Sequence, residues 1–164
     1  MDAASLHALT ALAITCAPLV HPMTTVALVG VESGGNPYAI GVVGGRLTRQ
    51  PRRIDEALEA ARRLRTAGWN FSLGIAQINV HNLPRLGLSM EAAFDPCPNL
   101  QAMQTVIVDC FDRASRHHVR PQQATRQALS CYYSGNFVTG FRHGYVGRVV
   151  RAAGSMPGTS AQAP

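Results

Sequence analysis

The chain has 164 residues, the size of a single domain, and 46% of them are apolar, enough for one substantial core. Charged residues make up 15%, which argues against a disordered chain or a coiled coil, and no apolar run approaches the ~20 residues of a membrane span. The net charge of +6 comes from fifteen arginines, without a single lysine, against nine acidic residues. This excess favours an anionic partner, and composition alone allows nucleic acid, membrane headgroups or an acidic polymer.

The first third of the chain predicts two helices followed by a hairpin. Apolar residues recur at helical spacing up to Cys16, and the absence of arginine there favours a first helix over a signal peptide. A second helix over Met23–Glu32 is apolar on every side, so it should be buried, and it ends in a Ser-Gly-Gly-Asn-Pro segment. The extended runs Tyr38–Val43 and Arg46–Gln50 flank two glycines and predict a β-hairpin.

Helical periodicity and capping residues dominate the rest of the chain. Residues 1–153 are expected to form one mainly α domain, and residues 154–164, rich in Gly, Ser, Pro and Ala, a flexible tail. Ser89 and Asp95 are the expected N-caps of a short and a long helix. The later helices are expected over 54–67, 89–94, 96–117, 122–133 and 145–153.

The four cysteines are Cys16, Cys97, Cys110 and Cys131, and no CxxC pair is present, so neither a zinc site nor another cofactor is predicted. Cys97 and Cys110 lie thirteen residues apart on one helix, about 20 Å, whereas a disulfide spans at most about 7 Å between Cα atoms. They are therefore not partners. An antiparallel pair of long helices favours Cys110 with Cys131, which leaves Cys16 with Cys97. Four buried free thiols are the alternative.

Glu32 is the carboxylic acid whose position needs an explanation. Burial and the negative end of its helix would both raise its pKa, so that it could stay protonated near neutral pH and donate a proton. Taken alone, an exposed glutamate at a helix end is the simpler interpretation. Two other segments shift this balance. Gly74–Asn79 alternates small or apolar residues with amides, which suit uncharged sugar groups, and Tyr132 and Tyr133 add phenols beside a turn.

In this order, Glu32-Ser33, Gly74-Ile75-Ala76-Gln77-Ile78-Asn79 and Cys131-Tyr132-Tyr133-Ser134-Gly135-Asn136 resemble the three signature segments of soluble-lytic-transglycosylase-like domains. The resemblance runs from about Leu12 to Val150, and within the family it is greatest to the transglycosylase subunits of type IV secretion systems. It implies a mainly α (α+β), goose-type-lysozyme-like domain with a small β-hairpin. It also implies cleavage of peptidoglycan between N-acetylmuramic acid and N-acetylglucosamine.

The resemblance also implies roles for single residues. Glu32 would act first as the acid and then as the base on the muramoyl C6 hydroxyl, which gives a 1,6-anhydro product without water. Tyr132 matches the tyrosine that hydrogen-bonds this glutamate, and Tyr133 stands where the wider family has asparagine. The expected substrate-binding residues are Ser33, Gln77, Asn79, Tyr132, Tyr133 and Asn136.

The distribution of acidic residues agrees with a mechanism that uses one carboxylate. Glycosidases that use water normally need two carboxyl groups, yet residues 60–90 contain no acid at all. A hydrolytic muramidase and a non-catalytic wall-binding assembly factor are the alternatives. The expected partners are peptidoglycan strands, whose peptide carboxylates match the positive charge, and other secretion subunits in the periplasm. Nucleic acid is not expected, because no basic recognition helix or aromatic-stacking motif is present.

Overall fold

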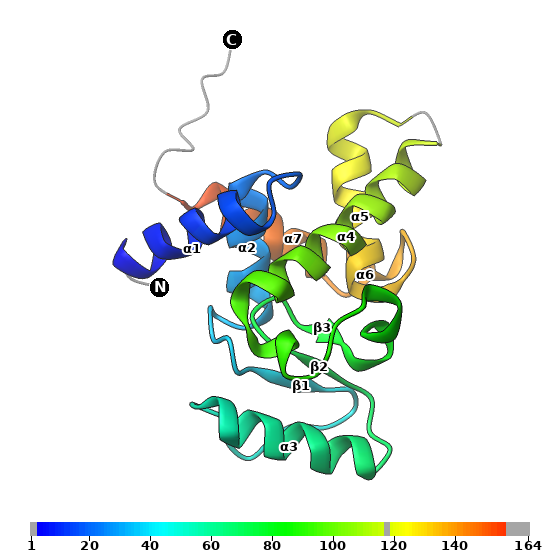
Figure 1. Cartoon of the computed structure of the whole chain (residues 1–164). Coiled ribbons are helices and arrows are strands. Elements are labelled where there is room, and N and C mark those ends of the chain that lie inside the picture. The colour runs from blue at the N-terminus through cyan, green and yellow to red at the C-terminus, as the bar shows by residue number, and fades with distance from the viewer. Residues whose placement is uncertain (1–2, 117–118, 157–164) are drawn as a thin grey trace.

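The structure is a computed structural model that describes residues 3–116 and 119–156 (Figure 1). The expected helix end at residue 117 and residues 157–164 of the expected tail lie outside these ranges. Within them, no helix combines the length and apolar character that crossing a membrane requires. The elements in chain order are α1 (Ala3–Cys16), α2 (Pro22–Glu32), β1 (Ile40–Val42), α3 (Ile54–Thr66), β2 (Phe71–Leu73), β3 (Ile78–Asn79), the short 3-10 helices η1 (Val80–Asn82), η2 (Pro84–Leu86) and η3 (Ala92–Phe94), α4 (Pro96–Ser115), α5 (Pro121–Ser134), α6 (Thr139–Arg142) and α7 (Tyr145–Gly154).

The mainly α fold with a small antiparallel sheet confirms the predicted class. Asp95 caps α4 as expected, since its side chain accepts from the backbone N–H of Cys97 at 3.1 Å. The helix expected over 89–94 is only the 3-10 helix η3, whose N-cap is Glu91, and Ser89 accepts from the N–H of Ala92 at 3.0 Å in the turn before it. Helix α6 was not predicted, because its four residues are too short to show a period. Figure 1 shows α3 and the sheet on one side of the molecule and the remaining helices on the other.

Helix α2 lies in the core of the helical part, where it packs against α1 and α7. Its residues from Thr25 to Val29 are all buried, as its uniformly apolar sequence predicts. The helix ends at Glu32, because the next residue leaves the helical conformation and two glycines with positive φ follow. The carboxyl of Glu32 is thereby carried to the boundary between the helices and the sheet.

The predicted hairpin around Gly44 and Gly45 is wrong. Strand β1 pairs instead with β2, and β2 pairs with β3, so the sheet order is β1-β2-β3. The run Arg46–Gln50 forms no strand. In its place the side-chain amide of Gln50 accepts from the N–H of Ile40 and donates to its C=O, both at 2.9 Å. One side chain thus satisfies the outer edge of β1, and the hairpin lies between β2 and β3.

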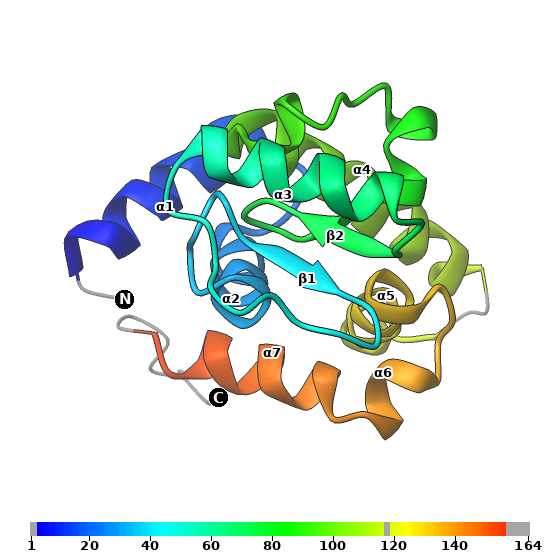
Figure 2. The same cartoon turned by 90° about the horizontal axis from the view of Figure 1, so that it is seen from below.

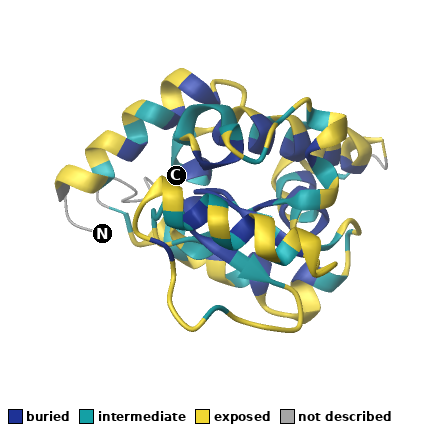
Figure 3. Cartoon of the chain, turned by 60° about the horizontal axis from the view of Figure 1, so that its bottom comes forward, coloured by how far each residue is buried: buried dark blue, intermediate teal, exposed yellow. Residues whose placement is uncertain are grey.

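The two faces of the sheet have different roles. Cross-strand pairing aligns Gly41 with Ser72 and Ser72 with Asn79, so small and polar residues form one row. Phe71 and Leu73 point to the opposite face and are fully buried. Helix α3 lies over that face (Figure 2) and turns its outer residues to solvent (Figure 3). The polar row is therefore free to face the helical part of the molecule.

Two disulfides join the helices, and their pairing confirms the predicted one. Cys16 at the end of α1 bonds Cys97 in the first turn of α4, with 5.2 Å between Cα atoms. Cys110 on α4 bonds Cys131 on α5, with 5.8 Å between Cα atoms. The second bond lies directly before Tyr132, so it holds the end of α5 against α4.

We expect the first disulfide to contribute more stability than the second. The bonded cysteines lie 81 residues apart in one case and 21 in the other. Loop-closure entropy gives about 4–5 kcal/mol for the long loop and about 3 kcal/mol for the short one. Urea unfolding of Cys16→Ala/Cys97→Ala and Cys110→Ala/Cys131→Ala measures both losses. An equal or reversed order of the losses would contradict the expectation.

Candidate active site

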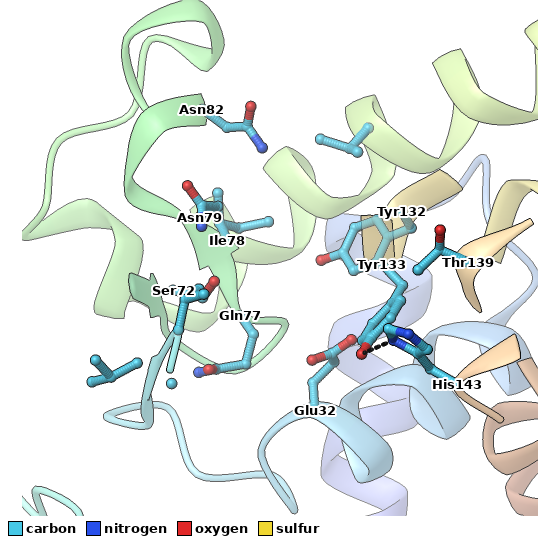
Figure 4. A pocket seen from close by; sticks show the side chains of 14 residues that line it. Glu32, Ser72, Gln77, Ile78, Asn79, Asn82, Tyr132, Tyr133, Thr139 and His143 are labelled. Carbon is cyan, nitrogen blue, oxygen red and sulfur yellow. Dashed lines mark hydrogen bonds between the residues drawn. The ribbon is translucent and has the colours of Figure 1, made fainter. Parts of the chain in front are cut away.

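A cleft of about 430 Å³ separates the sheet from α5, α6 and the end of α2 (Figure 4). One wall comes from the polar row of the sheet and the turn after β2. The other comes from the last turn of α5 and the segment around α6. The described residues that line it are Glu32, Gly41, Val42, Val43, Ser72, Gln77, Ile78, Asn79, Asn82, Val106, Tyr132, Tyr133, Thr139 and His143.

Glu32 is the only carboxylic acid among the described residues that line this cleft. Burial raises its pKa from the ordinary value of 4.5 to about 7, because the charged form loses hydration. A hydrogen bond from Tyr145 and the positive charge of Arg148 act in the opposite direction. At neutral pH the carboxyl is therefore present in comparable amounts as acid and as base.

The tyrosine that holds Glu32 is Tyr145, at the start of α7. Its hydroxyl donates to Oε1 of Glu32 at 2.5 Å, and its ring is 1% exposed. The expected donor, Tyr132, instead donates to the carbonyl of Ala76 at 2.6 Å. The difference follows from packing, because α7 lies against α2 and brings its first residue to the last residue of α2.

The turn that follows β2 is held by side chains from three helices. Tyr132 on α5 donates to the carbonyl of Ala76, and Ser33 after α2 donates to that of Ile75 at 2.6 Å. The buried amide of Asn99 on α4 accepts from the N–H of Ala76 at 2.8 Å. The same amide donates to the carbonyls of Leu73 and Ala93, at 3.0 and 2.7 Å. Every bond ends on backbone, so the turn has one position.

Gly74 is required at the start of this turn. Its φ is +79°, in the left-handed region that favours glycine. A Cβ here would lie 2.1 Å from the carbonyl oxygen of Ala93 and 2.4 Å from the amide nitrogen of Asn99. Since backbone and a fully bonded amide cannot move aside, the glycine is what lets α4 approach the turn.

Gln77 closes the turn with its side chain aimed into the cleft. Its backbone φ is +57°, a strained value for a residue with a Cβ. Its amide nitrogen donates to the carbonyls of Ala39 and Gly74, at 3.0 and 2.9 Å. Its amide oxygen lies over Gly41, where a Cβ would come within 2.5 Å of it. The amide is thus fixed with its oxygen turned to the cleft as an acceptor.

Tyr133 and His143 form the opposite wall (Figure 4). The Tyr133 hydroxyl lies 3.2 Å from Nδ1 of His143, and the Tyr133 ring stacks on Tyr145 with 4.6 Å between centroids. Arg148 donates to the backbone carbonyl of His143 at 3.1 Å. Tyr145, which holds Glu32, is therefore covered by Tyr133, which faces the cleft.

The other predicted site residues divide into two groups. Gln77, Asn79, Tyr132 and Tyr133 line the cleft with Glu32, as expected of site residues. Ser33 and Asn136 stand outside the set of described lining residues. Ser33 ties α2 to the turn, and Asn136 accepts from the N–H groups of Val138 and Thr139, which starts α6.

Comparison with known proteins assigns the chain to a family. The model of the transglycosylase SLT domain family matches residues 10–148. The chain belongs to this family. No solved structure matches the chain significantly. Among the described residues, no group of three His, Cys, Asp or Glu side chains could hold a metal ion.

Curated relatives support the same membership of the SLT family. The chain is 53% identical to the type IV secretion system protein virB1 of Brucella abortus over 148 residues, which are 87% of this chain and 62% of the relative. It is 35% identical to protein virB1 of Rhizobium radiobacter over 144 residues, 86% of this chain and 59% of the relative. The chain therefore spans about three fifths of the length of these relatives.

Sequence reasoning missed several residues of the candidate site. Tyr145 and Asn99 act across 113 and 23 residues of chain, so no local pattern links them to Glu32 or to the turn. Ser72 could have been found, because it lies two residues before Gly74 and alternates with two apolar neighbours. His143 and Thr139 enter the cleft only because α6 folds back onto α5.

Replacing Asn99 with leucine should destabilise the domain by roughly 3 kcal/mol or more, because three buried backbone groups lose their partner. Urea unfolding measures the loss. Gln101→Leu is the matched control on the same helix, where an exposed side chain should change stability by less than about 0.5 kcal/mol. A loss at Asn99 no larger than the control's would show that the amide does not anchor the turn.

Replacing Glu32 with glutamine should stabilise the protein at alkaline pH. Below pH 4.5 the carboxyl is protonated in both the folded and the unfolded chain, so the variant and the parent should be alike. Above about pH 7 the parent must hold a desolvated, part-buried carboxylate, which lowers its stability by on the order of 3 kcal/mol. Urea unfolding of both proteins at pH 3.5 and 8 tests this, and a pH-independent difference would contradict it.

Proposed function

We propose that the domain is a lytic transglycosylase that cleaves peptidoglycan between N-acetylmuramic acid and N-acetylglucosamine. The observation that carries this proposal is a single part-buried carboxyl among the described lining residues, Glu32, with a pKa raised to about 7 in a cleft lined otherwise by neutral polar and apolar groups and by His143. A hydrolase of the usual kind needs a second carboxyl about 5–9.5 Å away. Membership of the SLT family supports the same reaction.

In the first step, protonated Glu32 gives its proton to the glycosidic oxygen as the bond to the muramoyl C1 breaks. The leaving N-acetylglucosamine then departs as a neutral hydroxyl, and positive charge develops on the sugar. The carboxylate that remains is stabilised by the Tyr145 hydroxyl and by Arg148. These two groups offset part of the cost that burial places on the charged form.

In the second step, the Glu32 carboxylate takes the proton from the C6 hydroxyl of the same muramoyl unit. The C6 oxygen attacks C1, the 1,6-anhydro ring closes, and Glu32 is protonated again. A pKa near neutral suits both steps, because one group must first release and then accept a proton at the same pH. No second acid and no water molecule is consumed.

The cleft offers neutral hydrogen-bonding groups for the glycan. We assign the amide oxygen of Gln77 as an acceptor for a sugar hydroxyl or an acetamido N–H, because both its N–H groups are already used. Asn79 and Tyr133 are proposed as further contacts, and Tyr132 as the apolar face beside Glu32. Ser33 and Asn136 support the site through the turn and α6.

We propose that this activity opens the cell wall for a type IV secretion system, in the periplasm. The curated relatives carry the name virB1, and that of Brucella abortus is named as a protein of such a system. Two disulfides suit an oxidising compartment, and an excess of arginine suits a polymer that carries peptide carboxylates. Other subunits of the system are the expected protein partners.

Digestion of purified peptidoglycan should release muropeptides with 1,6-anhydro ends, detected by mass spectrometry. Glu32→Gln should lower this release at least about a hundredfold, because it removes the group that transfers the proton. The rate for the parent should fall as pH rises above about 7, where Glu32 loses the proton it must donate.

Glu91→Gln is the matched control, since Glu91 is exposed and lies outside the cleft. It should digest peptidoglycan at the rate of the parent. Products with reducing ends and no anhydro sugar would identify a hydrolytic muramidase instead. Equal activity of Glu32→Gln and parent would show that Glu32 takes no part in the reaction. If neither protein releases a product, the remaining interpretation is a non-catalytic, wall-binding assembly factor.

A further inference from the structure

A second groove, of about 520 Å³, is formed by α5, the residue before it and α6. We call it the α5–α6 groove. Its described lining carries two positive charges and no acidic side chain, together with three amides and one aromatic ring. The lining residues are Arg120, Gln122, Gln123, Arg126, Gln127 and Phe141.

This set of side chains is suited to an acidic peptide. The guanidinium groups of Arg120 and Arg126 have no ion-pair partner in the part of the chain that the structure describes, and guanidinium forks pair with carboxylates. Amide side chains match the donors and acceptors of peptide bonds. Phe141 is 45% exposed, which offers an apolar face to aliphatic side chains.

The groove has fixed walls. Helix α6 sits so close to α5 that a Cβ on Gly140 would lie 2.6 Å from the Cα of Ser130. The N–H of Gly140 donates to the Ser130 hydroxyl at 2.9 Å, and that hydroxyl donates to the carbonyl of Asn136 at 2.9 Å. A groove whose walls are already in place saves the cost of ordering them when a ligand binds.

The same two helices also build the catalytic cleft. Helix α5 places Tyr133 in the cleft and Arg126 in the groove, seven residues apart, which is about two turns on the same face of the helix and about 11 Å along it. Helix α6 places Thr139 in the cleft and Phe141 in the groove. An extended peptide of four or five residues reaches roughly 13–18 Å. A peptide attached to a sugar in the cleft is therefore long enough to follow α5 into the groove.

We propose that the α5–α6 groove binds the acidic stem peptide of the muramoyl unit whose glycan occupies the cleft. The proposal rests on the proposed function, and it names the part of the substrate that the groove recognises. Peptide carboxylates meet Arg120 and Arg126, and the aliphatic part of the peptide packs on Phe141. The groove would make the enzyme select peptide-bearing glycan over bare glycan.

The test compares two substrates, intact peptidoglycan and the same glycan stripped of its peptides by an amidase. In Arg120→Gln/Arg126→Gln, kcat/KM on intact peptidoglycan should fall about tenfold, which is about 1.4 kcal/mol, with little change on stripped glycan. Arg62→Gln/Arg65→Gln is the matched control, because these two arginines are equally exposed but lie on α3, away from the groove. In the control, the ratio of kcat/KM on intact peptidoglycan to kcat/KM on stripped glycan should be the same as in the parent.

Two outcomes would overturn the groove as the peptide site. The first is a groove variant whose ratio of kcat/KM on intact to stripped substrate equals that of the parent. The second is an equal drop of this ratio in the α3 variant, which would indicate attraction by net charge alone. A binding measurement separates this proposal from the proposed function. The stem tetrapeptide L-alanyl-γ-D-glutamyl-meso-diaminopimelyl-D-alanine, added to the parent, should shift the amide NMR signals of α5 and α6. If the parent digests neither substrate, shifts confined to these helices still support the groove, and their absence refutes it.

Discussion

One buried amide joins the helical part of the molecule to the wall of its cleft. Asn99 uses its oxygen and both N–H groups on backbone of β2, of the turn after β2 and of η3. Because a buried polar group that loses its partner costs free energy, the turn cannot shift without several bonds breaking at once. Helix α4 is in turn bonded to α1 and α5 through both disulfides. The position of Gln77 in the cleft therefore depends on the whole helical core.

The pKa of Glu32 is set by opposing effects and not by burial alone. The most buried helix of the core carries Glu32, so desolvation raises its pKa, while Tyr145 and Arg148 lower the pKa in part. The Tyr145 ring is covered by Tyr133, which keeps water from the bond that Tyr145 makes. The proposed mechanism, in which Glu32 gives and then takes a proton, needs this compromise, because a stronger effect of either sign would block one of the two transfers.

Features that neighbouring residues determine could be predicted from the sequence. Features that depend on contacts between distant parts of the chain could not. Asp95 caps α4 with its own side chain, and helix length alone excludes a bond between Cys97 and Cys110. The misplaced hairpin shows the limit, since the Gln50 amide bonds the N–H and C=O of Ile40 at the edge of β1, where a strand was expected. Tyr145 looks like any aromatic residue at the start of an amphipathic helix. Only the packing of α7 on α2 gives it its role.

The excess of arginine is compatible with the cleft because the structure keeps arginine out of it. A guanidinium next to Glu32 would stabilise the carboxylate and lower its pKa, and the acid that the proposed first step needs would be lost. None of the described lining residues is arginine, and Arg148 acts from behind the Tyr145 ring, 5.8 Å from its centroid. The remaining positive charge lies on outer surfaces such as the α5–α6 groove. The proposed attraction to an anionic polymer and the proposed catalytic acid are thus kept apart in space.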